Sequence, residues 1–93
     1  IWAYAQLTTG ERMVSAYAEL ESSGDFSITG EGQWRKMDNS TGEDYFSNSE
    51  DDVYSCEAGV YDSNKLFESA HAQYVIYSYE SGVDRPTQLW LNY

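Results

Sequence analysis

Cys56 and His71 each occur once in the chain, so they are the first candidates for nucleophilic chemistry. A cysteine nucleophile needs a cationic or basic neighbour that lowers its pKa, and segment 38–62 contains no basic residue. The chain also has no Gly-x-Ser-x-Gly motif. Cys56 lies on the apolar side of an alternating segment, which indicates a buried and inert thiol. A chain of 93 residues seldom builds the substrate cleft of a glycosidase, so we expect a protein that is not an enzyme.

Metal and cofactor motifs are also scarce. One Cys and one His are too few for the four-ligand zinc sites built on paired cysteines. The segment after Asp38 departs from a calcium-binding EF-hand loop, because Glu43 stands where glycine is needed and Ser49 stands where glutamate is needed. Gly30 and Gly32 lie inside a strand pattern with no helix after it, which argues against a phosphate loop. We expect no metal and no cofactor, with a low-affinity Ca²⁺ or Mg²⁺ site among Glu50, Asp51 and Asp52 as the alternative.

The charge of the chain is concentrated in one quarter of its length. The protein has 16 acidic and 5 basic residues, a net charge of −11. Residues 38–62 carry 8 of the acidic residues and no basic one. Such a charge excludes direct binding to nucleic acid or to an anionic membrane, and it attracts cationic partners.

Two aromatic residues, Tyr45 and Phe46, interrupt the acidic segment. Aromatic side chains inside a charged rim are typical of a protein-binding hot spot. The alternatives are that this pair packs against the core and that the acidic segment only keeps the protein solvated. The candidate partner-binding residues are Asp38, Glu43, Asp44, Tyr45, Phe46, Glu50, Asp51 and Asp52.

These observations predict an acidic binding or inhibitor protein that docks on a basic, nucleic-acid-binding surface of another protein. Anti-restriction and anti-CRISPR mimics of DNA or RNA, and nuclease immunity proteins, work on this physical principle. The alternative is a secreted or high-salt-adapted structural domain that assembles through its aromatic strands, with homo-oligomers as a consequence. The two hypotheses predict opposite effects of salt on binding.

The length predicts one small domain covering residues 1–93, with a long acidic surface loop at about 38–52. We expect an α+β fold, in which one or two helices pack on one face of a small antiparallel sheet. Residues 10–22 have an apolar stripe of helical spacing between a capping box and Gly24, and residues 63–73 are ambiguous between helix and strand. The alternative is an all-β antiparallel sandwich, because residues 14–20 also alternate.

Alternation predicts strands at 1–7, 26–35 and 53–61, and the aromatic segments 74–79 and 87–93 are expected to form a hairpin. Gly30 and Gly32 fall on the apolar face of the second strand, where they leave room for a bulky side chain of the next layer, such as an aromatic ring.

The targeting signals are sparse. No apolar stretch is long enough for a spanning helix, and the chain starts at Ile1, so we expect that residues before it were removed. The expected location is cytoplasmic, with secretion as the alternative if the removed part was a leader.

Overall fold

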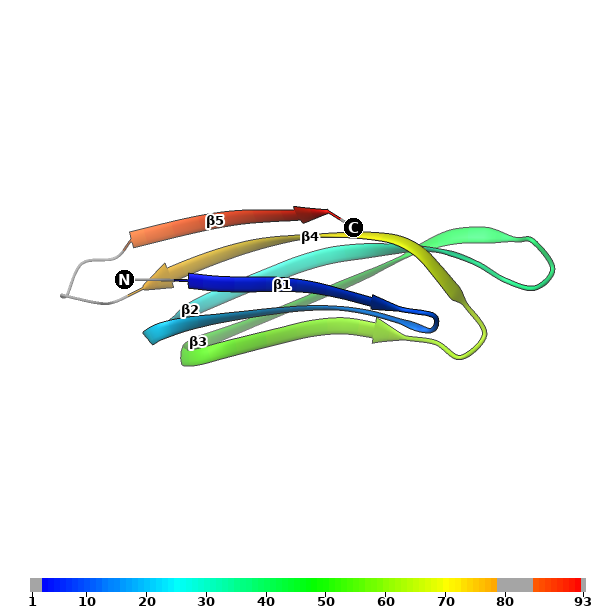
Figure 1. Ribbon diagram of the computed structural model, residues 1–93. Helices are drawn as coiled ribbons and strands as arrows, with labels where there is room; N and C mark the ends of the chain where they lie inside the picture. Colours follow the sequence, from blue (N-terminus) through cyan, green and yellow to red (C-terminus); the bar gives the residue numbers. More distant parts are fainter. Residues whose placement is uncertain (1–2, 79–84, 93) are drawn as a thin grey trace.

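The protein is built from five antiparallel β-strands. The computed structural model describes the backbone of residues 3–78 and 85–92 and the side chains of residues 4–77. The strands are β1 (Ala3–Gly10), β2 (Met13–Arg35), β3 (Thr41–Tyr61), β4 (Leu66–Ser78) and β5 (Arg85–Asn92) (Figure 1). Residues 3–78 and 85–92 contain no helix, so the α+β prediction is wrong and the all-β alternative is correct. None of these residues belongs to a helix that could cross a membrane.

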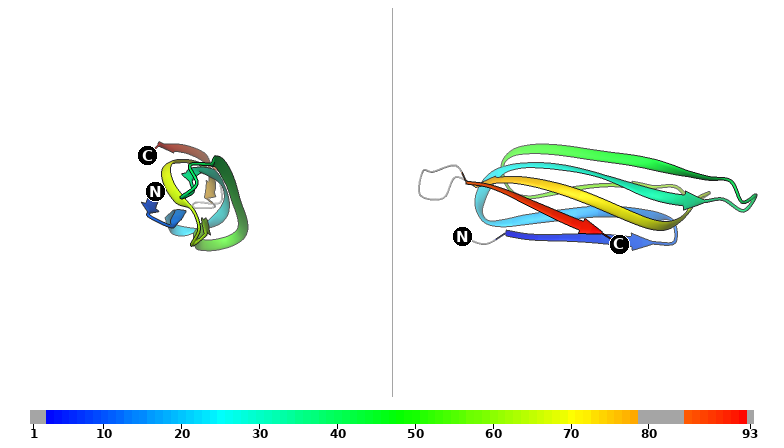
Figure 2. Two further views of the ribbon diagram at one scale, coloured as in Figure 1. Left: turned by 90° about the vertical axis from the view of Figure 1, so that its right-hand side faces the viewer. Right: turned by 90° about the horizontal axis from the view of Figure 1, so that it is seen from above.

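Strands β2 and β3 fold back on themselves together, and this creates two layers. Residues 13–20 of β2 pair with β1 and with residues 55–61 of β3. Residues 24–35 pair with β4 and, on the other side, with residues 41–53 of β3. Register shifts around Gly24 mark the corner, and both strands reverse direction at the same end of the molecule (Figures 1 and 2). The strands therefore form one sheet that folds over into two layers, and irregular pairing of this kind bends the strands at the corner.

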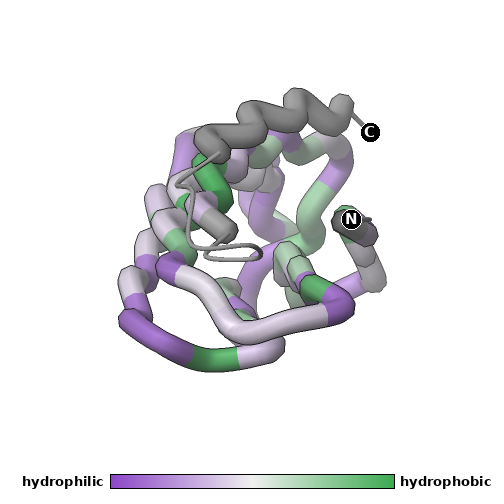
Figure 3. Tube along the Cα trace, turned by 90° about the vertical axis from the view of Figure 1, so that its left-hand side faces the viewer, coloured by the Kyte–Doolittle hydropathy of each residue, from purple (hydrophilic) through white to green (hydrophobic). Residues whose placement is uncertain are grey.

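The core lies between these two layers. β2 supplies Val14, Ala16, Ala18 and Leu20 from one layer and Phe26 and Ile28 from the other, all buried. β4 contributes Ala70, Ala72, Tyr74 and Ile76. Seen along the long axis, hydrophobic and hydrophilic residues alternate along the strands around this core (Figure 3). The result is a narrow rod with principal extents of 53 × 18 × 15 Å.

The prediction of a helix at residues 10–22 is wrong, because most of this segment belongs to β2. Its apolar residues fit both the 3.6-residue period of a helix and the two-residue period of a strand. Val14 and Leu20 fit a helical stripe, but they are also the ends of an alternating series whose members are all buried. This half of β2 is a central strand, paired with β1 on one side and with β3 on the other. Pairing on both sides outweighs the helix propensity of Ala, Glu and Met. The helix considered at 63–73 is also absent, since β4 begins at Leu66.

The acidic loop predicted at 38–52 is strand for most of its length. Only residues 36–40 lie between β2 and β3, and β3 begins at Thr41. β3 also includes the predicted strand 53–61. The predicted pairing of the last two segments is confirmed by the register of β4 with β5, while their connection, 79–84, lies outside the described residues.

The two glycines of β2 make room for aromatic rings, but these rings belong to neighbouring strands of the same layer, whereas the sequence predicts a side chain of the next layer. A Cβ atom at Gly30 would overlap the ring of Phe46. A Cβ atom at Gly32 would lie 2.8 Å from Phe67 Cδ1 and 2.7 Å from Val14 Cγ1 of the facing layer. The rings come from the neighbouring strands β3 and β4, so the glycines allow the edges of this layer to close over the core.

Candidate functional site

Most of the predicted binding residues lie on β3, which is an edge strand in the described part of the chain. Within that part β3 pairs with β2 alone. β3 carries six acidic residues and no basic one; the six are Glu43, Asp44, Glu50, Asp51, Asp52 and Glu57, called here the β3 carboxylates. Charged side chains on an edge strand also prevent unwanted pairing with other chains, which gives this composition a structural use of its own.

The strand alternation separates the predicted aromatic anchors. Tyr45 points outward and is 72% exposed, whereas Phe46 is 8% exposed and belongs to the core. The alternative that the pair packs against the core is therefore correct for Phe46 and wrong for Tyr45. Tyr45 remains available to a partner, and Phe46 holds β3 to the core beside Gly30.

Asp44 is already neutralised within the molecule. Its Oδ2 atom lies 2.7 Å from Lys65 Nζ, and Lys65 also lies 3.4 Å from Asp62 Oδ2. The hydrogen bond to Asp44 is the largest cause that raises the pKa of Lys65. The Lys65 ammonium also lies 4.7 Å from the centre of the Trp34 ring, a cation–π distance. This ion pair gives Asp44 a role within the fold.

Asp38 and Asp52 also have structural roles. Asp38 Oδ1 accepts hydrogen bonds from the Ser40 hydroxyl at 2.6 Å and the Ser40 backbone N–H at 2.9 Å, and these bonds lower the pKa of Asp38. Asp52 has a φ of 54° at the bend of β3. Aspartate is one of the few residues besides glycine that adopt this left-handed conformation readily.

The β3 carboxylates do not form one cluster, because β3 folds back on itself. Glu43 lies on its first half, whereas Glu57 lies on its second half, opposite Tyr17 in the other layer. The extended strand rises about 3.3 Å per residue, so the ten residues from Thr41 to Glu50 separate Asp38 from Glu50 by roughly 30 Å. Glu50 and Asp51 are exposed near the bend, and Glu43 is exposed near the other end. Glu57 was not among the predicted residues. It is exposed on the second half of β3, where its carbonyl oxygen accepts a 2.8 Å hydrogen bond from Asn48 Nδ2 and joins the two halves of the strand.

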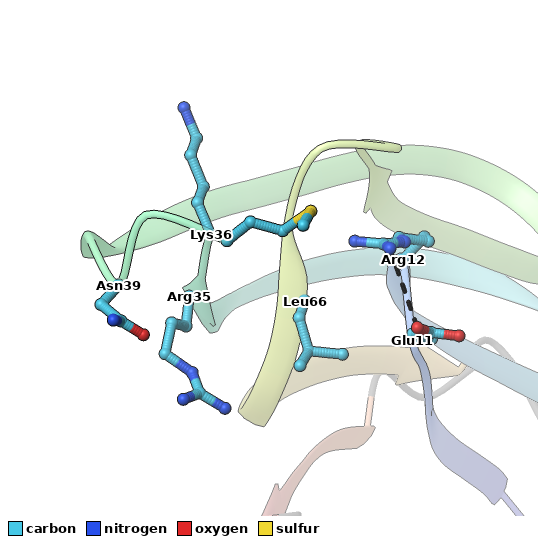
Figure 4. A pocket seen from close by; sticks show the side chains of 7 residues that line it. Glu11, Arg12, Arg35, Lys36, Asn39 and Leu66 are labelled. Carbon is cyan, nitrogen blue, oxygen red and sulfur yellow. Dashed lines mark ion pairs between the residues drawn. The ribbon is translucent and has the colours of Figure 1, made fainter.

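The four basic side chains among residues 4–77 gather at the opposite end from the bend. A hollow of about 330 Å³ there is lined by Arg12, Arg35 and Lys36, with Leu66 on its wall (Figure 4). Arg35 lies 2.7 Å from Glu68, and Arg12 lies 3.7 Å from Glu11. The Arg35 and Lys36 side chains point away from one another (Figure 4). These cations balance local carboxylates and do not converge on one point in the hollow.

A second group of residues surrounds Tyr45, and the sequence did not reveal it. Glu31 of β2 is paired in register with Tyr45 of β3 and with His71 of β4, so the three form a row across the outer face of one layer. We call them the Tyr45 row. The Tyr45 hydroxyl donates a 2.7 Å hydrogen bond to Glu43 Oε2. This bond, followed by the charges of Glu43 and Glu31, raises the pKa of Tyr45 to about 12.

Cys56 and His71 do not meet. Cys56 is buried on the inner side of β3, as its sequence position predicts, while His71 is exposed on the outer face of β4. Burial is the largest cause that raises the pKa of the Cys56 thiol to about 11. The nucleophile–base pair considered from the sequence is therefore not assembled.

Comparison with known proteins adds nothing to this geometry, because the chain matches no protein-family model, no curated protein and no solved structure.

Proposed function

We propose that this protein is a non-enzymatic binding protein that docks the acidic edge strand β3 on a basic surface of another protein. The single observation that carries the proposal is the imbalance on β3. Of its six carboxylates, only Asp44 forms an ion pair with a basic side chain among residues 4–77. The other five form no ion pair with a described basic side chain and are spread over both halves of β3.

Carboxylates spread along an edge strand suit a basic groove that normally receives a nucleic acid, since that groove presents Lys and Arg side chains along its length. Glu43, Glu50, Asp51 and Glu57 would supply the charge, and Tyr45 would supply the aromatic contact. We assign the other four predicted residues to the support of this surface. Asp38 closes the turn before β3, and Asp44 pairs with Lys65. Phe46 packs in the core, and Asp52 forms the bend of β3.

A charge-matched pair of variants tests the proposal. Glu50→Gln with Glu57→Gln removes two exposed charges from β3, and Glu11→Gln with Glu21→Gln removes two exposed charges elsewhere. Core histones serve as the basic nucleic-acid-binding probe, and duplex DNA serves as the competitor. We expect the β3 variant to bind about fivefold more weakly than the control variant, with a shallower dependence on salt. Equal affinities of the two variants would contradict the proposal.

The second candidate is self-assembly through β3, and exposed aromatic residues favour it. Tyr54 and Tyr61 are 63% and 69% exposed on the same edge strand. Assembly of this kind would strengthen at high salt, because screening removes the repulsion between acidic strands. Sedimentation velocity from low to high salt distinguishes the candidates, since docking on a basic partner weakens over the same range.

A further inference from the structure

A hollow on the outer face of the molecule adjoins Tyr45 and has the chemistry of a site for a single cation. Its volume is about 130 Å³, and Glu31, Tyr45 and His71 line it together with Thr29, Gly30 and Gln73. A second hollow of about 280 Å³ shares Thr29, Gly30 and Tyr45. Tyr45 therefore stands beside both hollows on the outer face of β2.

The register holds the walls of this hollow in place. Side chains directly opposite one another on antiparallel strands have Cβ atoms about 4.5–5.5 Å apart. Glu31 lies on the middle strand, with Tyr45 and His71 opposite it on either side. The Glu31 side chain is 16% exposed, so the two flanking side chains shield its carboxylate without closing it off.

The Glu31 carboxylate gives the hollow a charged group that only accepts hydrogen bonds. One Glu31 oxygen lies 3.4 Å from His71 Nδ1, a long contact that leaves the carboxylate with unused acceptor capacity. The Tyr45 hydroxyl donates a hydrogen bond to Glu43, which fixes the ring and places a second carboxylate beside it. No Lys or Arg among residues 4–77 forms an ion pair with Glu31 or Glu43.

We propose that this hollow receives the guanidinium group of one arginine of the basic partner, an inference that depends on the proposed function. A guanidinium is planar, so it stacks on an aromatic ring while donating several hydrogen bonds to a carboxylate. The Tyr45 ring, the Glu31 carboxylate and the Gln73 side chain supply these contacts. A lysine ammonium is a compact point charge and would use fewer of them.

The molecule contains a matched control for Tyr45. Tyr17 donates a 2.7 Å hydrogen bond to Glu19 two residues away, as Tyr45 does to Glu43, but it lies in the other layer. Tyr17→Leu therefore removes the same type of side chain and the same type of hydrogen bond without touching the hollow. Tyr45→Leu and Glu31→Gln remove the ring and the charge of the proposed site.

The experiment measures binding of two ten-residue peptides to the full chain by calorimetry at low salt. Both alternate a basic residue with serine, one using arginine and the other lysine. We expect the arginine peptide to bind about fivefold more tightly, and Tyr45→Leu and Glu31→Gln each to abolish that preference, while Tyr17→Leu preserves it. Folding of each variant is checked by circular dichroism. Equal affinity for the two peptides, or the same loss in Tyr17→Leu, would overturn the inference.

Failure of this inference can be told apart from failure of the proposed function. If the function holds and the hollow is not the site, both peptides lose affinity in the Glu50→Gln, Glu57→Gln variant but not in its control, and arginine has no advantage. If the function fails, the two charge variants bind both peptides equally. NMR spectra of the wild type locate the contact directly. With the arginine peptide we expect chemical-shift changes at Gly30 and His71.

Discussion

The Tyr74 hydroxyl of β4 donates a 2.7 Å hydrogen bond to the backbone carbonyl oxygen of Gln6 in β1. The two strands belong to different layers, so this bond joins the layers from within the core. Burial, the largest cause, raises the pKa of Tyr74 to about 12 and keeps the phenol in the neutral form that donates the bond.

Tyr74→Phe tests the strength of this link. The substitution leaves the Gln6 carbonyl without its partner, and the expected loss is about 1 kcal/mol in the free energy of unfolding. Urea denaturation monitored by tryptophan fluorescence measures it. Tyr77→Phe is the control, because Tyr77 is 42% exposed on the same strand. An equal loss in both variants would show that the bond to Gln6 contributes nothing of its own.

Two adjacent residues of β3, one pointing inward and one outward, should differ strongly in their contribution to the free energy of unfolding. Phe46→Ala creates a cavity beside Gly30 and should lower the free energy of unfolding by about 3–5 kcal/mol. Tyr45→Ala removes an exposed ring and should change it by less than about 1 kcal/mol. Thermal unfolding of both variants decides the matter. Similar destabilisation would contradict the assignment of Phe46 to the core and Tyr45 to the surface.

Cys56 should be protected from alkylation in the folded protein. Its thiol is neutral at physiological pH, since burial raises its pKa to about 11. Iodoacetamide should therefore react far more slowly than with free cysteine at pH 8, and the rate should rise as the pH approaches 11. Because the folded pKa exceeds the unfolded value, this group contributes stability below pH 9 that is lost as the pH rises through 11. Fast reaction of the native protein at pH 8 would show that Cys56 is not buried.

The raised pKa of Tyr45 should depend on Glu43. The hydrogen bond to that carboxylate is its largest cause, so Glu43→Gln should shift the pKa down from about 12 toward 10. The phenol then ionises at a lower pH, which NMR titration of the Tyr45 ring detects. Glu57→Gln is the control, since Glu57 is not among the causes of the shift. An unchanged titration in Glu43→Gln would contradict the hydrogen bond.

Sequence patterning predicted strands where one face is clearly apolar. The alternation from Phe26 to Trp34 identified the second half of β2 and its glycines correctly. It failed for residues 10–22, where Val14 and Leu20 fit either period and only pairing on both sides selects the strand. Propensity is a weak guide for such a segment, because neighbours distant in sequence decide its conformation.

The first half of β3 was missed for a different reason. Its inward positions hold Gly42, Asp44, Phe46 and Asn48, so only one of the four carries a large apolar side chain. A strand paired on one side needs few apolar residues, and the serines and carboxylates of its outer face are also typical of loops. The Tyr45 row was beyond the reach of the sequence, because Glu31 and His71 meet only through the register of three strands.

The folded-back ribbon of β2 and β3 has a consequence for how the chain reaches its native state. The 36–40 turn is closed locally by hydrogen bonds from Lys36 N to Ser40 O and from Asn39 N to Lys36 O, both 2.9 Å. Pairing can then advance step by step from Arg35 with Thr41, around the corner, to Met13 with Tyr61. Each new pair closes only a short additional loop, so partners far apart in sequence meet at a small entropic cost. We expect the paired strands β2 and β3 to form the folding nucleus, onto which β1 and β4 dock afterwards.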